Sequence, residues 1–375
     1  MAPMVRVSTL PMRLLALRQG CDIAYSEELI DVKLSSTKRV VNEKLNTIDY
    51  ISKDRAVVYR TCEQDRNNVL QLGTASSVSA LKAAQHVVND ICAIDINMGC
   101  PKFFSVQGGM GSALLSKPET IKDILTTLIR NLPVPVTCKI RLLKTDQETI
   151  DLLKIIESTG VSAIGVHMRE IPERPKDPAH WDRLATILAN SSYSVPIIAN
   201  GDIYTHQDID NVLNQTKANS VMIARGAIRN VSVFSKDKSL KSFHQIIQDY
   251  IQIAYEKDNL FPNTKYVVNQ ILNENDETKT EKARQTSVVK SMKDLCTIWE
   301  MTNQYEQFLN PPTIPILMEN QEENDQTKSE ESSSTTTKKH TIDETIQENI
   351  KTKEPSIKRF KSKEEDQEPP LPSIS

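Results

Sequence analysis

The chain is short of glycine and aromatic residues and has no long hydrophobic run. Only 10 of its 375 residues are glycine, and aromatic residues make up 5%. No apolar run approaches the roughly 18 residues that indicate a membrane-spanning helix, so we expect a soluble protein. The GxGxxG fingerprint is also absent, which argues against a dinucleotide-binding Rossmann sheet.

Paired cysteines are missing as well. The six cysteines form no CxxC pair and have no regular spacing, so we expect a reduced protein without a metal site. Lys and Arg total 46 against 49 Asp and Glu, with the acidic excess in the segment from Glu319 onward. Because the rest is nearly neutral, a local basic patch must hold any nucleic-acid partner.

The scarce glycine is concentrated around one cysteine. Four of the ten glycines lie between Asn97 and Gly111, where NMGCP, containing Cys100, is followed by GGMG. Glycine lets the backbone turn sharply and approach a ligand closely. This segment therefore predicts a loop that holds a thiol beside a bound molecule.

Short apolar, β-branched runs alternate with amphipathic segments, a pattern typical of a parallel sheet wrapped by helices. The predicted strands are Asp22 to Tyr25, Val69 to Leu72, Ala93 to Ile96, Pro135 to Ile140, Ala163 to Val166, Pro196 to Ala199 and Ser220 to Ile223. The predicted helices include Ser79 to Asn89, Pro118 to Leu132, Gln147 to Thr159 and Trp181 to Ala189.

Polar residues stand where most of these strands end. They are Gln71, Asn97 with Cys100, Lys139, His167, Asn200 with Gly201, and Ala224 with Arg225. Successive positions are 25 to 39 residues apart, close to the roughly 30 residues of a strand-helix-strand unit. In a (β/α)8 barrel the carboxyl ends of the strands converge on one mouth. We therefore predict an α/β protein with a TIM barrel and one site at that mouth.

The last two strand ends indicate the kind of ligand. The runs Asn200-Gly201-Asp202 and Ala224-Arg225-Gly226 follow the seventh and eighth strands, where barrels commonly bind phosphate. Arg225 would add a cation. Spacing alone supports a phosphate-bearing ligand, and a mid-barrel Lys139 together with Gln71 favours flavin mononucleotide, FMN.

Five blocks of the sequence resemble the tRNA-dihydrouridine synthases of the eukaryotic cytoplasmic type, which act on the D-loop uridine at tRNA position 20. The blocks are Ala2 to Val7, Leu10 to Leu15, Glu27 to Asp31, Asn97 to Leu115, and Val136 to Arg141. The resemblance covers roughly residues 2 to 310, and NMGCP followed by GGMGxALL is its most specific part.

The resemblance implies an oxidoreductase that carries FMN, takes electrons from NADPH or NADH, and reduces the 5,6 double bond of a D-loop uridine. It implies that Cys100 donates the proton, and that the protein is a cytoplasmic monomer with tRNA as its partner. The implied FMN-binding residues are Ala2, Pro3, Met4, Gln71, Lys139, His167, Asn200, Gly201, Asp202, Ala224 and Arg225. The implied substrate contacts are Asn97, Arg141, Arg169 and Lys265.

We predict three segments: an FMN-binding barrel over 1–240 with a shortened first strand, a helical tRNA-binding domain over 241–312, and a disordered low-complexity tail over 313–375. The basic tract 358–363 is compatible with a nuclear address. Met168 replaces the glycine that the family usually has after His167, and we expect it to crowd the flavin.

Three alternatives stay open. A different FMN barrel oxidoreductase, such as one similar to dihydroorotate dehydrogenase, would also place a cysteine over a pyrimidine. A catalytically weak tRNA-binding form is compatible with a chain that starts just before Ala2. In the third alternative the helical domain only caps the barrel and does not bind tRNA.

Overall fold

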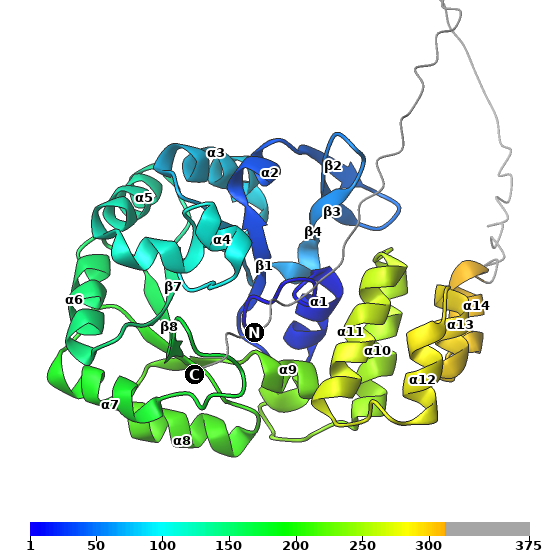
Figure 1. Ribbon diagram of the computed structural model, residues 1–375. Helices are drawn as coiled ribbons and strands as arrows, with labels where there is room; N and C mark the ends of the chain where they lie inside the picture. The colour runs from blue at the N-terminus through cyan, green and yellow to red at the C-terminus, as the bar shows by residue number, and fades with distance from the viewer. Residues whose placement is uncertain (312–375) are drawn as a thin grey trace, which may run out of the picture. The chain divides into compact units, whose positions relative to one another are not determined.

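Seven parallel strands form one curved sheet in the computed structural model, which describes residues 1–311 (Figure 1). The strand order is β1-β5-β6-β7-β8-β9-β10, which follows the order of the chain. The strands are β1 (Ala24–Ile30), β5 (Asn68–Gly73), β6 (Ala93–Asn97), β7 (Val136–Leu142), β8 (Ala163–Glu170), β9 (Ile197–Asn200) and β10 (Ser220–Met222). All seven predicted strands are confirmed.

Helices return the chain between these strands and cover the outer face of the sheet (Figure 1). They are α3 (Ser77–Val87), α5 (Pro118–Asn131), α6 (Asp146–Glu157), α7 (Trp181–Asn190) and α8 (His206–Thr216). Thr145 and Thr205 begin α6 and α8 with capping boxes, which satisfy backbone N–H groups at the first turn. Each helix turns its apolar stripe toward the sheet, as in α5, where Ile121, Leu125 and Leu128 are buried.

Two residues bridge the outer strands of the sheet. The Ala2 N–H donates to the Ile223 carbonyl at 2.9 Å, and the Tyr25 N–H donates to the Met1 carbonyl at 3.1 Å. The backbone of Met1 and Ala2 therefore lies between β10 and β1 and closes the sheet. The predicted (β/α)8 barrel is confirmed.

A second sheet, which the sequence pattern did not predict, follows the first barrel strand. Strands β2 (Lys38–Asn42), β3 (Thr47–Ile51) and β4 (Val57–Thr61) pair antiparallel in the order β2-β3-β4. The short helix α2 (Asp31–Ser35) connects β1 to this sheet, and a 3-10 turn over Glu63–Asp65 leads from it to β5.

Helix α1 (Leu10–Arg18) is anchored by a buried ion pair. Arg13 is 2% exposed and donates to both carboxylate oxygens of Asp65, to the Ser8 carbonyl and to the Arg60 carbonyl. The shortest of these bonds, to Asp65, is 2.6 Å. One guanidinium thus joins α1 to β4 and to the turn that precedes β5.

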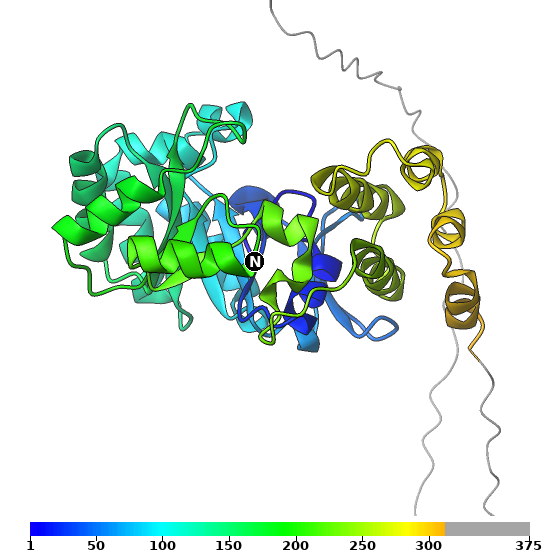
Figure 2. The ribbon, with the colours of Figure 1, turned by 90° about the horizontal axis from the view of Figure 1, so that it is seen from below.

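The helices that follow β10 form a layer beside α1. They are α9 (Arg225–Arg229), α10 (Phe243–Glu256), α11 (Phe261–Glu274), α12 (Glu281–Val288), α13 (Met292–Ile298) and α14 (Thr302–Leu309). Helices α10 and α11 lie next to the barrel, and α12 to α14 lie outside them (Figure 2). Helix α10 packs through an apolar face on which Ile246, Tyr250 and Ile253 are buried.

Several contacts tie this helical layer to the barrel. Arg60 donates to the Lys257 carbonyl at 2.6 Å, and the Arg6 guanidinium lies 3.9 Å from the centre of the Tyr266 ring. Residues 1–311 belong to one compact unit, so the domain boundary at residue 240 stays a prediction. The predicted tail 313–375, with its basic tract 358–363, lies outside the described residues.

Within residues 1–311, no helix combines the length and the apolar composition that crossing a membrane requires.

We expect Arg13→Met to lower the free energy of unfolding by about 3 to 5 kcal/mol, because Asp65 would remain buried without its partner. Urea unfolding of the purified protein measures this loss. As a control, Arg66→Met removes an ion pair with Glu63 in which both side chains are more than 70% exposed, and should cost less than about 1 kcal/mol. Equal losses in the two variants would contradict the anchoring role of Arg13.

Candidate active site

A cavity of about 740 Å³ opens at the carboxyl ends of the barrel strands, and residues from β6 to β10 and the loops after them form its wall. Nine of the predicted site residues lie on this wall: Cys100, Arg141, His167, Arg169, Asn200, Gly201, Asp202, Ala224 and Arg225. The barrel therefore gathers side chains that are far apart in the sequence around one space.

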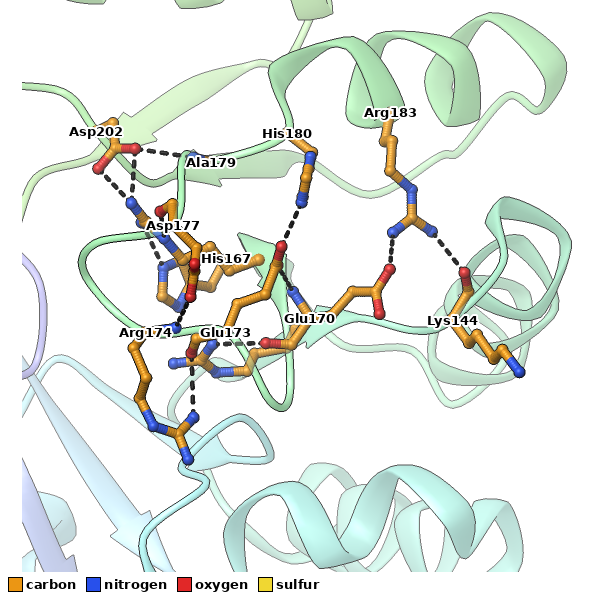
Figure 3. Close-up of polar contacts among 12 residues, drawn as sticks. Lys144, His167, Glu170, Glu173, Arg174, Asp177, Ala179, His180, Arg183 and Asp202 are labelled. Atoms are coloured by element: carbon orange, nitrogen blue, oxygen red, sulfur yellow. Dashed lines mark hydrogen bonds and ion pairs between the residues drawn. The ribbon is translucent and has the colours of Figure 1, made fainter. Parts of the chain in front are cut away.

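Asp202 organises the basic side of the cavity. Its carboxylate accepts hydrogen bonds of 2.6 Å from Arg169 and from Arg225. It also accepts one of 2.8 Å from the Ala179 N–H (Figure 3). Arg225 also lies over the ring of Tyr204, 5.4 Å from its centre. The Asp202 carboxylate therefore holds the two arginines in place, and its own contact with a flavin stays a prediction.

The cavity wall carries a concentration of positive charge. His167 lies 3.3 Å from an Arg169 nitrogen, and burial, followed by the charges of Lys139 and Arg141, depresses its pKa far below the ordinary value. Burial and the neighbouring Arg169 also lower the pKa of Arg141 to about 10. Cations that depress one another's pKa are stabilised by an anion, so the wall suits a phosphate group.

The loop after β6 places Cys100 on the wall of the same cavity. The Asn97 side-chain oxygen accepts hydrogen bonds from the N–H groups of Gly99 and Cys100, at 3.0 and 3.1 Å. The Ser112 N–H donates to the Cys100 carbonyl, and Gly111 has a φ of +58°, where a Cβ would lie 2.6 Å from that carbonyl oxygen. Asn97, predicted as a substrate contact, therefore uses its carbonyl oxygen to shape the cysteine loop.

Two predicted flavin-binding residues, Gln71 and Lys139, belong to the barrel interior and not to the cavity wall. Gln71 donates to Asp95 at 2.8 Å, and Thr137 donates to the same carboxylate at 2.7 Å. Burial raises the pKa of Asp95 to about 6, and burial together with Arg141 lowers the pKa of Lys139 to about 7. The sequence reasoning missed Asp95, although a carboxylate within the apolar run Ala93 to Ile96 was a visible signal.

The predicted N-terminal flavin contacts lie at the closure of the barrel. Ala2 is buried in a small cluster with Tyr25, Val69, Ala93 and Met222. Pro3 and Met4 follow it and are half-buried. None of the three predicted residues lines the cavity, so their contact with a flavin stays a prediction.

Lys265, predicted as a substrate contact, lies in α11 away from the cavity. Its ammonium donates to the carbonyls of Ser287 and Val289, at 3.3 and 3.0 Å. These bonds tie α11 to the carboxyl end of α12. Lys265 therefore has a structural role in the helical layer, whatever it contributes to tRNA binding.

Several wall residues were missed by the sequence reasoning, among them Lys102, Phe103, Glu173 and Arg174. Phe103 is 78% exposed at the start of the short helix α4 (Phe103–Gln107), and Glu173 is paired with His180 at 2.6 Å (Figure 3). Met168 is 0% exposed and packs in the hydrophobic core. The expectation that it crowds the cavity is wrong, because alternate residues of β8 face opposite sides.

A cysteine and several arginines that line one cavity at the mouth of a (β/α)8 barrel are typical of an enzyme that binds a phosphate-bearing ligand. The chain belongs to the dihydrouridine synthase (Dus) family, whose model matches residues 1–330. The resemblance deduced from the cysteine loop is thereby confirmed.

Curated relatives agree with this family. The chain is 39% identical over 311 residues to the tRNA-dihydrouridine(20) synthase [NAD(P)+] of Schizosaccharomyces pombe, a match that covers 80% of this chain and 64% of that protein. It is 36% identical over 292 residues to the Saccharomyces cerevisiae enzyme of the same name, covering 72% and 76%. A tRNA-dihydrouridine(20a/20b) synthase [NAD(P)+]-like protein of Homo sapiens is 32% identical over 262 residues, covering 68% and 75%.

We expect Lys139→Met to stabilise the flavin-free protein while weakening its retention of flavin. The folded pKa of Lys139, about 7, lies below its ordinary value of 10.5, so the unfolded chain binds an extra proton between these pH values and stability rises with pH. Removing the amine should raise the free energy of unfolding at pH 7 by on the order of 2 kcal/mol.

Urea unfolding at pH 7 and pH 9.5 measures this effect. The variant's gain in free energy of unfolding should be smaller at pH 9.5. At that pH more of the unfolded parent chains carry a neutral Lys139, as the folded protein does. An advantage that does not change with pH would contradict a buried charge as its cause.

Proposed function

We propose that this protein reduces the 5,6 double bond of a uridine in the D-loop of tRNA to dihydrouridine. The observation that carries the proposal is that Cys100 lines the same cavity as His167, Arg169 and Arg225, in a chain of the Dus family. Reduction of the double bond adds a hydride to one carbon and a proton to the other. Cys100 is the proton donor in this proposal.

The cofactor proposed is FMN, with NADPH or NADH as reductant. The fit rests on the arginines of the cavity wall, which suit the phosphate. Gln71 and Lys139 lie off that wall, and their contact with the heterocycle stays a prediction. When bound, FMN would supply the hydride. The names of the relatives, which carry NAD(P)+, support a nicotinamide reductant.

The cavity rim supports RNA as the substrate. Phe103 exposes 78% of its surface beside Lys102 and Arg174. Proteins that bind unstacked bases combine exposed aromatic rings with cations that contact the phosphates. The position 20 uridine is the target indicated by the names of the two yeast relatives, while the monomeric state and the cytoplasmic location stay predictions.

We expect Cys100→Ala to keep its flavin and lose most of its turnover, because the substrate carbon would lack its proton donor. General acid catalysis is worth about 10²-fold to 10⁴-fold, so the rate of dihydrouridine formation should fall by at least about 10²-fold. The visible spectrum measures flavin content, and dihydrouridine mapping of tRNA measures product.

Cys92→Ala is the matched control, because Cys92 packs against the small cluster around Ala2 and lies off the cavity wall. Full activity in Cys100→Ala would remove the assignment of the thiol. Purified protein that oxidises dihydroorotate and leaves tRNA unchanged would instead favour the alternative FMN oxidoreductase.

The helical layer is proposed to bind tRNA, and Arg284 offers the cleaner test. Arg284 is 65% exposed in α12 and pairs with Glu281, so Arg284→Glu should leave stability within about 1 kcal/mol. Lys265→Glu would place a carboxylate against two carbonyl oxygens and cost about 1 to 3 kcal/mol. If the layer contacts phosphates, Arg284→Glu weakens tRNA binding by roughly threefold to tenfold with the flavin intact.

Filter binding at several salt concentrations measures this affinity, and the charge reversal should also flatten its dependence on salt. Arg130→Glu, on the exposed face of α5, is the control for a change of net charge. Unchanged affinity in Arg284→Glu would favour helices that only cap the barrel.

A further inference from the structure

The carboxyl group of Glu28, in the first barrel strand, contacts the cysteine loop through Ser105. The pairing of β1 with β5 shifts between Tyr25 and Glu28, which marks a β-bulge, and bulges re-aim side chains near functional sites. Glu28 Oε1 accepts a hydrogen bond of 3.3 Å from Ser105 Oγ, and Ser105 is fully buried in α4. The bulged strand therefore directs an acid at the loop that carries Cys100.

The carboxyl of Glu28 lies close to the backbone of Gly73. A Cβ on Gly73 would lie 2.6 Å from Glu28 Oε1 and 3.2 Å from the carboxyl carbon. Real Cβ atoms essentially never approach other atoms as closely as the first of these distances. The end of β5 is thus shaped to leave room for the carboxyl of Glu28.

Cys100 is a neighbour of the same carboxyl. The point that a Cβ on Gly111 would occupy lies 3.1 Å from Cys100 Cβ and 3.3 Å from Ser105 Cβ, so these two side chains stand side by side. Burial raises the pKa of Glu28 above its ordinary value. The hydrogen bond from Ser105, the nearby polar side chains of Cys100 and Asn97, and the charge of Lys102 lower this pKa only in part.

We propose that Glu28 is a positioning residue that returns a proton to Cys100 after each reduction. The proposal rests on the proposed function, in which Cys100 gives its proton to the substrate carbon and is left as a thiolate. In the return step the Glu28 carboxylate first takes a proton from a hydronium ion or a buffer acid in the solvent. Its O–H bond then breaks as the S–H bond of Cys100 forms, which restores the carboxylate, and no electron is transferred.

The exposure of the two side chains fits this route. Glu28 is partly exposed and can exchange its proton with solvent, while Cys100 is partly exposed on the cavity wall. A substrate in the cavity would cover the Cys100 thiol. A proton that arrives through Glu28 would then reach the sulfur without water at the reacting carbon. A carboxyl whose pKa is raised suits proton transfer near neutral pH.

The first test uses full-length protein and needs no turnover. Iodoacetamide alkylates the thiolate, and peptide mass spectrometry separates Cys100 from the other cysteines. In Glu28→Gln the negative charge beside the sulfur is lost, so Cys100 should react roughly fivefold faster at pH 7.5. Ser105→Ala, which keeps the carboxyl charge, should react within about twofold of the parent protein. An unchanged rate in Glu28→Gln would overturn the proposal.

The second test measures proton return over many turnovers, with NADPH and with tRNA in excess over the protein. Glu28→Ala should form dihydrouridine roughly tenfold to 100-fold more slowly, while reduction of its flavin by NADPH stays within about twofold because that step needs no Cys100 proton. Formate at tens of millimolar should restore much of the rate by replacing the missing acid, whereas chloride should not. A slow variant that formate fails to rescue would indicate a structural effect and reject the role.

The two proposals fail in different ways. If the parent protein forms no dihydrouridine, the proposed function is wrong, and the alkylation rates alone then decide whether Glu28 acts on Cys100. If the parent protein is active and Glu28→Ala is equally fast, only the role of Glu28 is rejected.

Discussion

Closure of the parallel sheet is the constraint on which the site depends. Seven strands leave two edges, and the backbone of Met1 and Ala2 bridges them through hydrogen bonds to β10 and β1. Closure brings the carboxyl ends of all the strands to one mouth, so side chains from neighbouring strands meet around one cavity. The buried pair of Arg13 and Asp65 holds α1, which follows this segment, against the small β2-β3-β4 sheet.

The like charges buried around the cavity lower the stability of the folded protein and favour the binding of an anion. Asp202 compensates Arg169 and Arg225, but Lys139, His167 and Arg141 all have depressed pKa values because burial and like charges oppose protonation. Perturbed groups gathered in a cleft are typical of functional sites. An anionic ligand would relieve this repulsion, because its charge favours the protonated forms of these groups.

Many residues of the recognised motifs act on the backbone around the site. Asn97 and Gly111 hold the cysteine loop in shape, and Lys265 joins two helices through their carbonyls. Gly73 lies outside the quoted motifs, but it also shapes the site because its lack of a side chain leaves space for Glu28. A short sequence signature can therefore identify the family while the direct contacts of its individual residues remain for the structure to determine.

The sequence by itself determined the seven strands, the barrel and the strand ends that carry the site, because buried parallel strands leave continuous apolar runs followed by polar residues. It did not determine the β2-β3-β4 sheet, whose short strands are partly exposed and lack such runs. Nor could it show that Met168 faces the core, that Lys265 bonds to α12, or that Glu28 meets the cysteine loop 77 residues away through Ser105. Tertiary structure decided these points, because packing between distant segments sets the direction of a side chain at a bulge, strand end or helix contact.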